Sequence, residues 1–237
     1  MTGRTLAVVL LLSAGLARAQ DCPRPEGAGG GVSTQSAQQR LSFLSRVVAV
    51  ESAKARRWTL GWGATYGLLT VLQLALTGAS SDADDVDWYV GAFSSAVGVA
   101  FALFDPLEVR DAGPGYVNRA AKATPEDTCA LLVEGERMVK EGAGQQAFGT
   151  AWFMHVANVA FNAAVGLFLG LFFAHWTAGI VNIVVGAGLG EGTIFTRSTG
   201  LVSAWEEYRG ARPSSLRFFF APAVGLAGVG VRAGFTF

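Results

Sequence analysis

The chain has 237 residues, a length that suits a single domain. Hydrophobic residues make up 51% of it, charged residues only 15%, and the mean hydropathy is +0.38. Soluble domains carry about 25% charged residues, and the deficit here is concentrated in a few apolar runs, which favours a membrane protein. Lys and Arg together number 18 and are balanced by 18 Asp and Glu, so nothing in the composition supports nucleic-acid binding.

The first residues have the layout of a secretory signal peptide. Arg4 precedes the apolar run Leu6–Leu16, and Ala17-Arg18-Ala19 gives an A-x-A cleavage site, so we expect residues 1–19 to be removed. The alternative is a short N-terminal anchor, although eleven apolar residues are too few to span a bilayer. Residues 20–32 contain two prolines and three consecutive glycines, which predicts a flexible leader.

Two cysteines remain after the signal peptide, Cys22 and Cys129. An exported protein enters an oxidising compartment, where such a pair can close a disulfide. The alternative, two unrelated thiols, stays open at this point.

A polar helix is expected before the first apolar run. Ser33 or Thr34 can cap a helix that extends to about Arg57. Leu41 and Leu44 lie on one face of this helix, which can therefore lie along a membrane surface or pack on a helical bundle.

Four apolar runs are candidates for transmembrane helices. A helix rises about 1.5 Å per residue, so about 20 apolar residues cross the roughly 30 Å hydrocarbon core. Aromatic residues mark the start of the first run as an interfacial belt, and a two-residue link makes the last two runs a tight hairpin. The four spans are residues 58–77, 88–104, 151–174 and 177–196.

Three further segments lie between or after the spans. The polar segment 105–150 has one clear helix start, Thr124-Pro125-Glu126-Asp127, and its helix is expected to end at Gly142. A short helix carries Leu201, Trp205 and Tyr208 on one face and ends near Gly210. Near the end of the chain, residues of two kinds alternate with a period of two: Val229, Val231, Phe235 and Phe237 with Gly230, Arg232, Gly234 and Thr236. With a turn at residues 225–228, this pattern predicts a terminal β-hairpin over residues 216–237.

The fold class expected from these elements is mainly α. It is an integral membrane bundle of about four transmembrane helices, with flanking amphipathic helices and a C-terminal β-hairpin, in a single membrane domain covering residues 33–237. The ending Val-Arg-Ala-Gly-Phe-Thr-Phe resembles the closing strand of outer-membrane β-barrel proteins. The alternative fold is therefore an outer-membrane β-barrel, in which each long apolar run would form two strands.

The distribution of Lys and Arg and the signal peptide predict opposite orientations in the membrane. With four spans, every Lys and Arg of the mature chain lies on one side, which the positive-inside rule would make cytoplasmic. The signal peptide would make the same side periplasmic. An outer-membrane location resolves the conflict and is favoured here over an inner-membrane protein that breaks the rule.

One polar group of residues lies within the spans: His155, Asn158 and Asn162 on the third, and Asn182 and Glu191 on the fourth. Ionisable groups within a membrane are expensive and often functional, so these residues form a candidate polar intramembrane site. The alternative is that they bridge helices by hydrogen bonds. No catalytic, metal-binding or cofactor-binding motif is present in the sequence.

The functional expectation is a non-enzymatic integral membrane protein of the bacterial cell envelope with a structural or interaction role. Its expected partners are the lipid bilayer and either other envelope proteins or further copies of itself. The alternatives are a small channel or transporter that uses His155, Asn162 and Glu191, and an intramembrane enzyme, which would require His155 to lie close to Glu191.

Overall fold

The computed structural model describes residues 22–25, 29–79, 85–104, 107–210, 217–225 and 228–236. The predicted signal peptide lies outside this part of the chain, and so do residues 80–84 between the first two predicted spans. The elements in chain order are η1 (Gly31–Thr34), α1 (Ala37–Thr77), α2 (Asp85–Phe104), α3 (Glu108–Ala120), α4 (Thr128–Gly149), α5 (Trp152–Phe173), α6 (Trp176–Phe195), α7 (Gly200–Arg209), β1 (Arg217–Gly225) and β2 (Gly228–Thr236).

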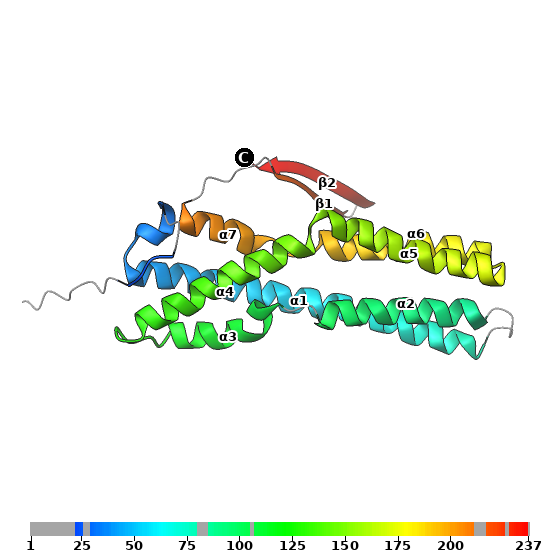
Figure 1. Cartoon of the computed structure of the whole chain (residues 1–237), viewed down its shortest axis with the longest axis horizontal. Coiled ribbons are helices and arrows are strands. Elements are labelled where there is room, and N and C mark those ends of the chain that lie inside the picture. Colours follow the sequence, from blue (N-terminus) through cyan, green and yellow to red (C-terminus); the bar gives the residue numbers. More distant parts are fainter. Residues whose placement is uncertain are drawn as a thin grey trace, which may run out of the picture.

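The helices form two regions, a membrane region and a polar head (Figure 1). The second half of α1 lies with α2, α5 and α6 at one end, and the first half of α1 lies with α3, α4 and α7 at the other. Within the described residues, four helices are long and apolar enough to cross a membrane. The prediction of a mainly helical protein with four such helices is confirmed. The barrel alternative is wrong for these runs, since each of them is a continuous helix.

Helix α1 joins the head to the membrane region. It has 41 residues and is therefore about 60 Å long. The predicted polar helix and the predicted first span are thus one element. It starts at the N-cap Ser36 rather than at Ser33 or Thr34, because Ser36 and Gln39 form a reciprocal capping box, while the earlier pair lies in η1.

The membrane region exposes large apolar side chains. Leu68 is 70% exposed, Val184 66% and Phe172 74%, on three different helices. Exposed apolar area on this scale requires a cover of lipid or protein. The remaining spans match the predicted ones closely, with α2, α5 and α6 starting or ending within a few residues of the expected bounds.

The head has a core of its own. Leu44 and Val48 of α1, Tyr116 of α3 and Leu132 of α4 are fully buried in one cluster. Helix α3 was not predicted, because its sequence contains Gly113, Pro114 and Gly115, which usually interrupt helices. Helix α4 continues past Gly142 to Gly149, and the side chain of Leu201 fills the space that the missing side chain of Gly142 leaves.

Helices α5 and α6 pack backbone to backbone. A Cβ atom on Gly166 would collide with the carbonyl oxygen of Gly179, and one on Gly179 with the carbonyl of Gly166. Small residues allow this approach in lipid. The turn between the helices is as tight as predicted, with Ala174 in the left-handed conformation at φ 59°.

The C-terminal strands β1 and β2 pair antiparallel, with Arg217 opposite Thr236 and Gly225 opposite Gly228. This pairing forms a two-stranded sheet in the part of the chain that the structure describes.

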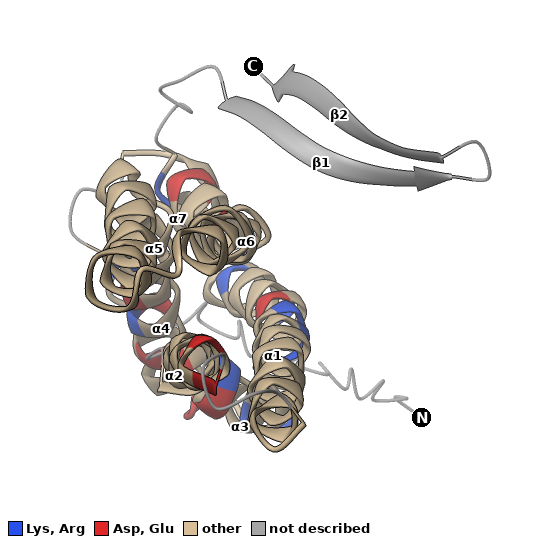
Figure 2. Ribbon diagram, turned by 90° about the vertical axis from the view of Figure 1, so that its right-hand side faces the viewer, with Lys and Arg blue, Asp and Glu red and all other residues tan. Residues whose placement is uncertain are grey.

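Basic residues of the described helices lie in the head rather than along the spans; Figure 2 looks along the helices from the membrane end and colours Lys and Arg blue. Helices α2, α5 and α6 contain no Lys or Arg, and neither does α1 after Arg57. Apart from Arg217 and Arg232 in the C-terminal strands, the described basic residues therefore belong to the head and to its border with the membrane region.

Candidate functional site: a polar cavity between two helical hairpins

A cavity of about 790 Å³ lies between the hairpin formed by α1 and α2 and the hairpin formed by α5 and α6. Most of its wall is apolar or made of small residues, as is usual for ligand cavities. Uncharged polar side chains from both hairpins interrupt this wall. They include Gln73, Ser94 and Ser95 on one hairpin and Asn158, Asn162 and Asn182 on the other.

Aromatic residues of α1 close the end of the cavity near the head. The indole nitrogen of Trp58 donates to the carbonyl of Thr193 at 3.1 Å, and the hydroxyl of Tyr66 lies 2.9 Å from the hydroxyl of Thr193. Trp62 donates to Thr196 at 2.8 Å. Sequence analysis predicted an interfacial belt here, but Trp58 and Tyr66 are each only 8% exposed and hold α1 against α6.

A histidine and an aspartate join the hairpins at the opposite end. Nδ1 of His175, in the turn before α6, lies 2.7 Å from Oδ1 of Asp87 in the first turn of α2. The hairpins are thus linked at both ends, and the cavity lies between these links.

The predicted polar residues do come together, with one exception. Nδ1 of His155 lies 2.5 Å from Oε2 of Glu191, and the other carboxylate oxygen of Glu191 accepts from the Asn158 amide at 2.9 Å. The Asn162 amide donates to the side-chain oxygen of Asn158 at 2.9 Å. Asn182 lies apart, donating to the carbonyl of Ala178, although it also lines the cavity.

A chain of hydrogen bonds thus connects His155 and Glu191 to the cavity wall. Asn158 and Asn162 line the cavity, whereas His155 and Glu191 are outside the set of described residues that line it. Each asparagine fits into the space left by a glycine of α6, because a Cβ on Gly186 would collide with Asn162 and one on Gly190 with Asn158.

Sequence reasoning missed the polar residues contributed by the first hairpin. Ser95 donates to the side-chain oxygen of Gln73 at 2.9 Å, and the side chain of Gln73 fills the space beside Gly91. Gln73, like the asparagines, is a polar side chain inside an apolar span, and this feature marks it in the sequence as a candidate site residue.

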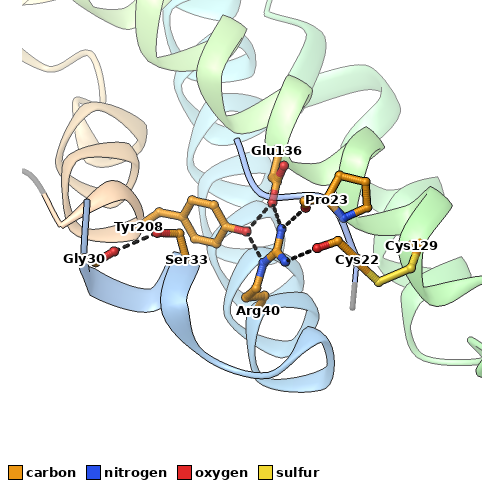
Figure 3. A network of polar contacts seen from close by, with 8 residues as sticks. All are labelled: Cys22, Pro23, Gly30, Ser33, Arg40, Cys129, Glu136 and Tyr208. Atoms are coloured by element: carbon orange, nitrogen blue, oxygen red, sulfur yellow. Dashed lines mark hydrogen bonds and ion pairs between the residues drawn. A yellow bond between two sulfur atoms is a disulfide. The ribbon is translucent and has the colours of Figure 1, made fainter. Parts of the chain in front are cut away.

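The head contains a second polar cluster, built around a buried arginine (Figure 3). Arg40 is 2% exposed and lies 2.5 Å from Oε1 of Glu136 on α4. It also donates to the hydroxyl of Tyr208 on α7 at 2.9 Å and to the carbonyls of Cys22 and Pro23. Tyr208 donates in turn to Glu136. Four separate segments therefore meet at one guanidinium.

The environment of this cluster shifts the pKa of its members. Burial acts to lower the pKa of Arg40, but the hydrogen bonds to Tyr208 and Glu136 outweigh it and leave that pKa raised. Burial, together with the hydrogen bond to Glu136, raises the pKa of Tyr208 well above its ordinary value.

The structure joins Cys22 and Cys129 by a disulfide, so it brings the two sequence-predicted cysteines together. The bond ties the leader to α4, 107 residues later, and Cys22 is buried in the head core. The first described residues of the leader are therefore held in place, which differs from the flexible leader expected from the prolines and glycines.

A third polar cluster lies where the head meets the membrane region. The buried carboxylate of Glu51 accepts from Ser198 at 2.5 Å, from Lys54 at 2.7 Å and from Gln146 at 3.2 Å. Gln146 also accepts from the backbone nitrogen of Leu201. These contacts hold α1 and α4 to the segment between α6 and α7.

Among the described residues, no group of three or more His, Cys, Asp or Glu side chains could hold a metal ion. Searches of protein-family models, of curated proteins and of solved structures find no match to this chain.

Proposed function

We propose that this chain is a non-enzymatic integral membrane protein that passes a small uncharged polar solute through the cavity between its two hairpins. The observation that carries the proposal is the cavity itself, about 790 Å³ in volume and placed among the four apolar helices. The polar side chains of the wall are hydrogen-bonded to one another or to the backbone, but an amide side chain has two donor hydrogens and an oxygen with two lone pairs. The positions that these contacts leave unused can bind water or a solute with hydrogen-bonding groups.

The chemistry of the wall supports an uncharged solute. Lys and Arg are missing from the described lining residues, and the one acidic residue among them, Asp87, is already in contact with His175. Asparagine, glutamine and serine side chains each donate and accept hydrogen bonds, so they can replace the hydration of a neutral polar molecule.

The contact between His155 and Glu191 is the geometry that an intramembrane enzyme would need, but its surroundings favour another role. Glu191 accepts a hydrogen bond from the Asn158 amide, and the ring of His155 packs against Phe195 at 5.0 Å between centroids. We interpret His155 and Glu191 as positioning residues that orient Asn158 at the cavity wall.

Flux measurements in proteoliposomes test the proposal. Stopped-flow light scattering with water, glycerol and urea would give faster volume changes for vesicles that contain the protein than for empty vesicles. The variant Ala157→Trp, in the cavity wall, should reduce the rate to that of empty vesicles. Ala160→Trp is the matched control, because Ala160 is an exposed residue of the same helix that does not line the cavity.

Glu191→Gln should lower the flux while the protein stays folded, since the Asn158 amide loses its carboxylate partner. Equal rates for the wild-type protein and empty vesicles, for all three solutes, would contradict the proposal.

The head supports a second candidate, a structural or interaction role. Arg40, the disulfide and Glu51 fix the relative positions of the leader, α1, α4 and α7, which gives a preorganised surface for other envelope proteins or for another copy of the chain. Absence of flux together with a specific crosslink from the head would favour this role.

For the location, we propose export to the bacterial envelope with the head in an oxidising compartment. The disulfide supports this, because disulfides persist mainly outside the reducing cytosol. The outer membrane is favoured because the positive-inside rule does not govern insertion there, and the inner membrane is the alternative. Separation of the two membranes on a density gradient distinguishes them.

A further inference from the structure

A second cavity, of about 500 Å³, lies on α1 at the border between the head and the membrane region. Its wall combines two basic side chains, two indoles and several hydroxyls. The lining residues that matter here are Lys54, Arg57, Gly61, Trp62, Thr65 and Thr196.

The residues on α1 form one stripe along the helix axis. Lys54, Arg57 and Gly61 follow one another by three and four positions, which places them on one face of the helix. The stripe extends from Lys54 to Thr65, a rise of about 16 Å. It starts among charged residues and ends among the apolar ones of the first span.

The basic end of this cavity carries a positive charge that can bind an anion. Lys54 contacts the buried carboxylate of Glu51, whereas Arg57 is exposed and has no hydrogen-bond or ion-pair partner among the described residues. A guanidinium presents a planar set of donors that matches a phosphate. The guanidinium of Arg197 lies close by, 5.4 Å above the ring of Trp58.

The apolar end of the cavity is open. A Cβ atom on Gly61 would meet nothing within 4 Å, so the missing side chain leaves free space next to Trp62. The indole of Trp62 donates to the hydroxyl of Thr196, and tryptophans prefer the level of the lipid headgroups.

We propose that this cavity binds the phosphate headgroup of an anionic membrane lipid, with Arg57 and Lys54 at the phosphate and the first part of an acyl chain beside Gly61. Basic pockets at the ends of transmembrane helices suit such lipids, and each basic residue near the surface contributes about a fivefold gain in binding. The proposal is independent of the solute cavity, because the two cavities share no lining residue.

Native mass spectrometry of the purified full-length protein tests the proposal. Phosphatidylglycerol and phosphatidylcholine with identical acyl chains are added separately to protein in detergent. The expected result is one tightly bound phosphatidylglycerol and weaker, unsaturated binding of phosphatidylcholine.

Two variants address the two ends of the cavity. Arg57→Gln should weaken binding of phosphatidylglycerol about fivefold. Gly61→Leu should weaken it by filling the space for the acyl chain, and should fold normally because Leu favours a helix more than Gly does. Arg46→Gln is the matched control, since it removes the same charge from an exposed position of the same helix and should leave binding unchanged.

Three results would overturn the proposal. Equal binding of the two lipids would show that the phosphate charge is not recognised. An equal effect of Arg46→Gln and Arg57→Gln would show only general electrostatic attraction. If inorganic phosphate raised the thermal unfolding temperature as much as phosphatidylglycerol does, the site would be one for a soluble anion.

Discussion

Arg40 shows how one residue can organise the head. Its side chain is 2% exposed, and it contacts the leader, α4 and α7 from its place on α1. A buried charge whose partner is removed costs about 3–5 kcal/mol, because the charge stays desolvated without compensation. The head therefore depends on the complete cluster of Arg40, Glu136 and Tyr208.

The variant Glu136→Gln tests this dependence. It keeps the size of the side chain but leaves Arg40 without its anionic partner, so the free energy of unfolding should fall by about 3 kcal/mol. Thermal or denaturant unfolding in detergent, followed by circular dichroism, measures the change. Glu134→Gln is the control on the same helix. Its ion pair with Arg119 is exposed and should contribute less than about 1 kcal/mol. Similar losses in the two variants would contradict the assigned role of Arg40.

The stability of the head should also fall at alkaline pH. Burial raises the pKa of both Tyr116 and Tyr208, so the folded state keeps these phenolic protons to a higher pH than the unfolded state does. Their contribution to stability is complete below the unfolded pKa of about 10 and is lost as the pH rises above it.

Unfolding curves between pH 8 and 12 would measure this loss, with those limits chosen about two units either side of the ordinary tyrosine pKa. The double variant Tyr116→Phe with Tyr208→Phe should depend less on pH in that range. An unchanged slope in the double variant would show that other groups cause the alkaline loss.

At the level of the elements, glycine positions decide how closely α5 and α6 approach. Gly166→Ala should separate the helices, because the added Cβ collides with the backbone of Gly179, which cannot rotate away. We expect a loss of about 1–3 kcal/mol, the usual cost of overpacking. Gly188→Ala is the matched control on α6, where a Cβ meets nothing within 4 Å and should be neutral or stabilising. Unfolding titrations in mixed micelles compare the two, and equal stability would contradict the close packing.

The sequence predicted the spans well and the polar helices less well, for a physical reason. Apolar runs such as Trp152–Phe173 have a fixed length requirement in a bilayer, so composition alone defines their ends. Helix α3 has no such requirement. It contains Pro114 between two glycines, and its stability comes from packing of Tyr116 and Gly113 against the head, which local sequence does not reveal.

One candidate site could likewise be predicted from the sequence, and another could not. The group around His155 could be predicted because His155, Asn158 and Asn162 follow one another by three and four positions on α5, and Glu191 lies on the other helix of the same hairpin. Arg40 could not be matched with Glu136 and Tyr208, since 96 and 168 positions separate them. One signal was available: Arg40, Leu44 and Val48 share the spacing of a buried face.

The whole molecule combines a polar head, closed by a disulfide, with four apolar helices that enclose a cavity. Every functional proposal made for it assumes that lipid surrounds the apolar helices and that the head lies on one side of the bilayer. The described cysteines are both in the disulfide, so the native protein should not react with maleimides.

Labelling of single introduced cysteines in sealed, uniformly oriented proteoliposomes tests that assumption most directly. Lys122→Cys, in the head, and Ala79→Cys, at the end of the first span, should react with a membrane-impermeant maleimide from opposite sides, and Leu68→Cys should react from neither. Reaction of Lys122→Cys and Ala79→Cys from the same side, or rapid reaction of Leu68→Cys, would contradict the account.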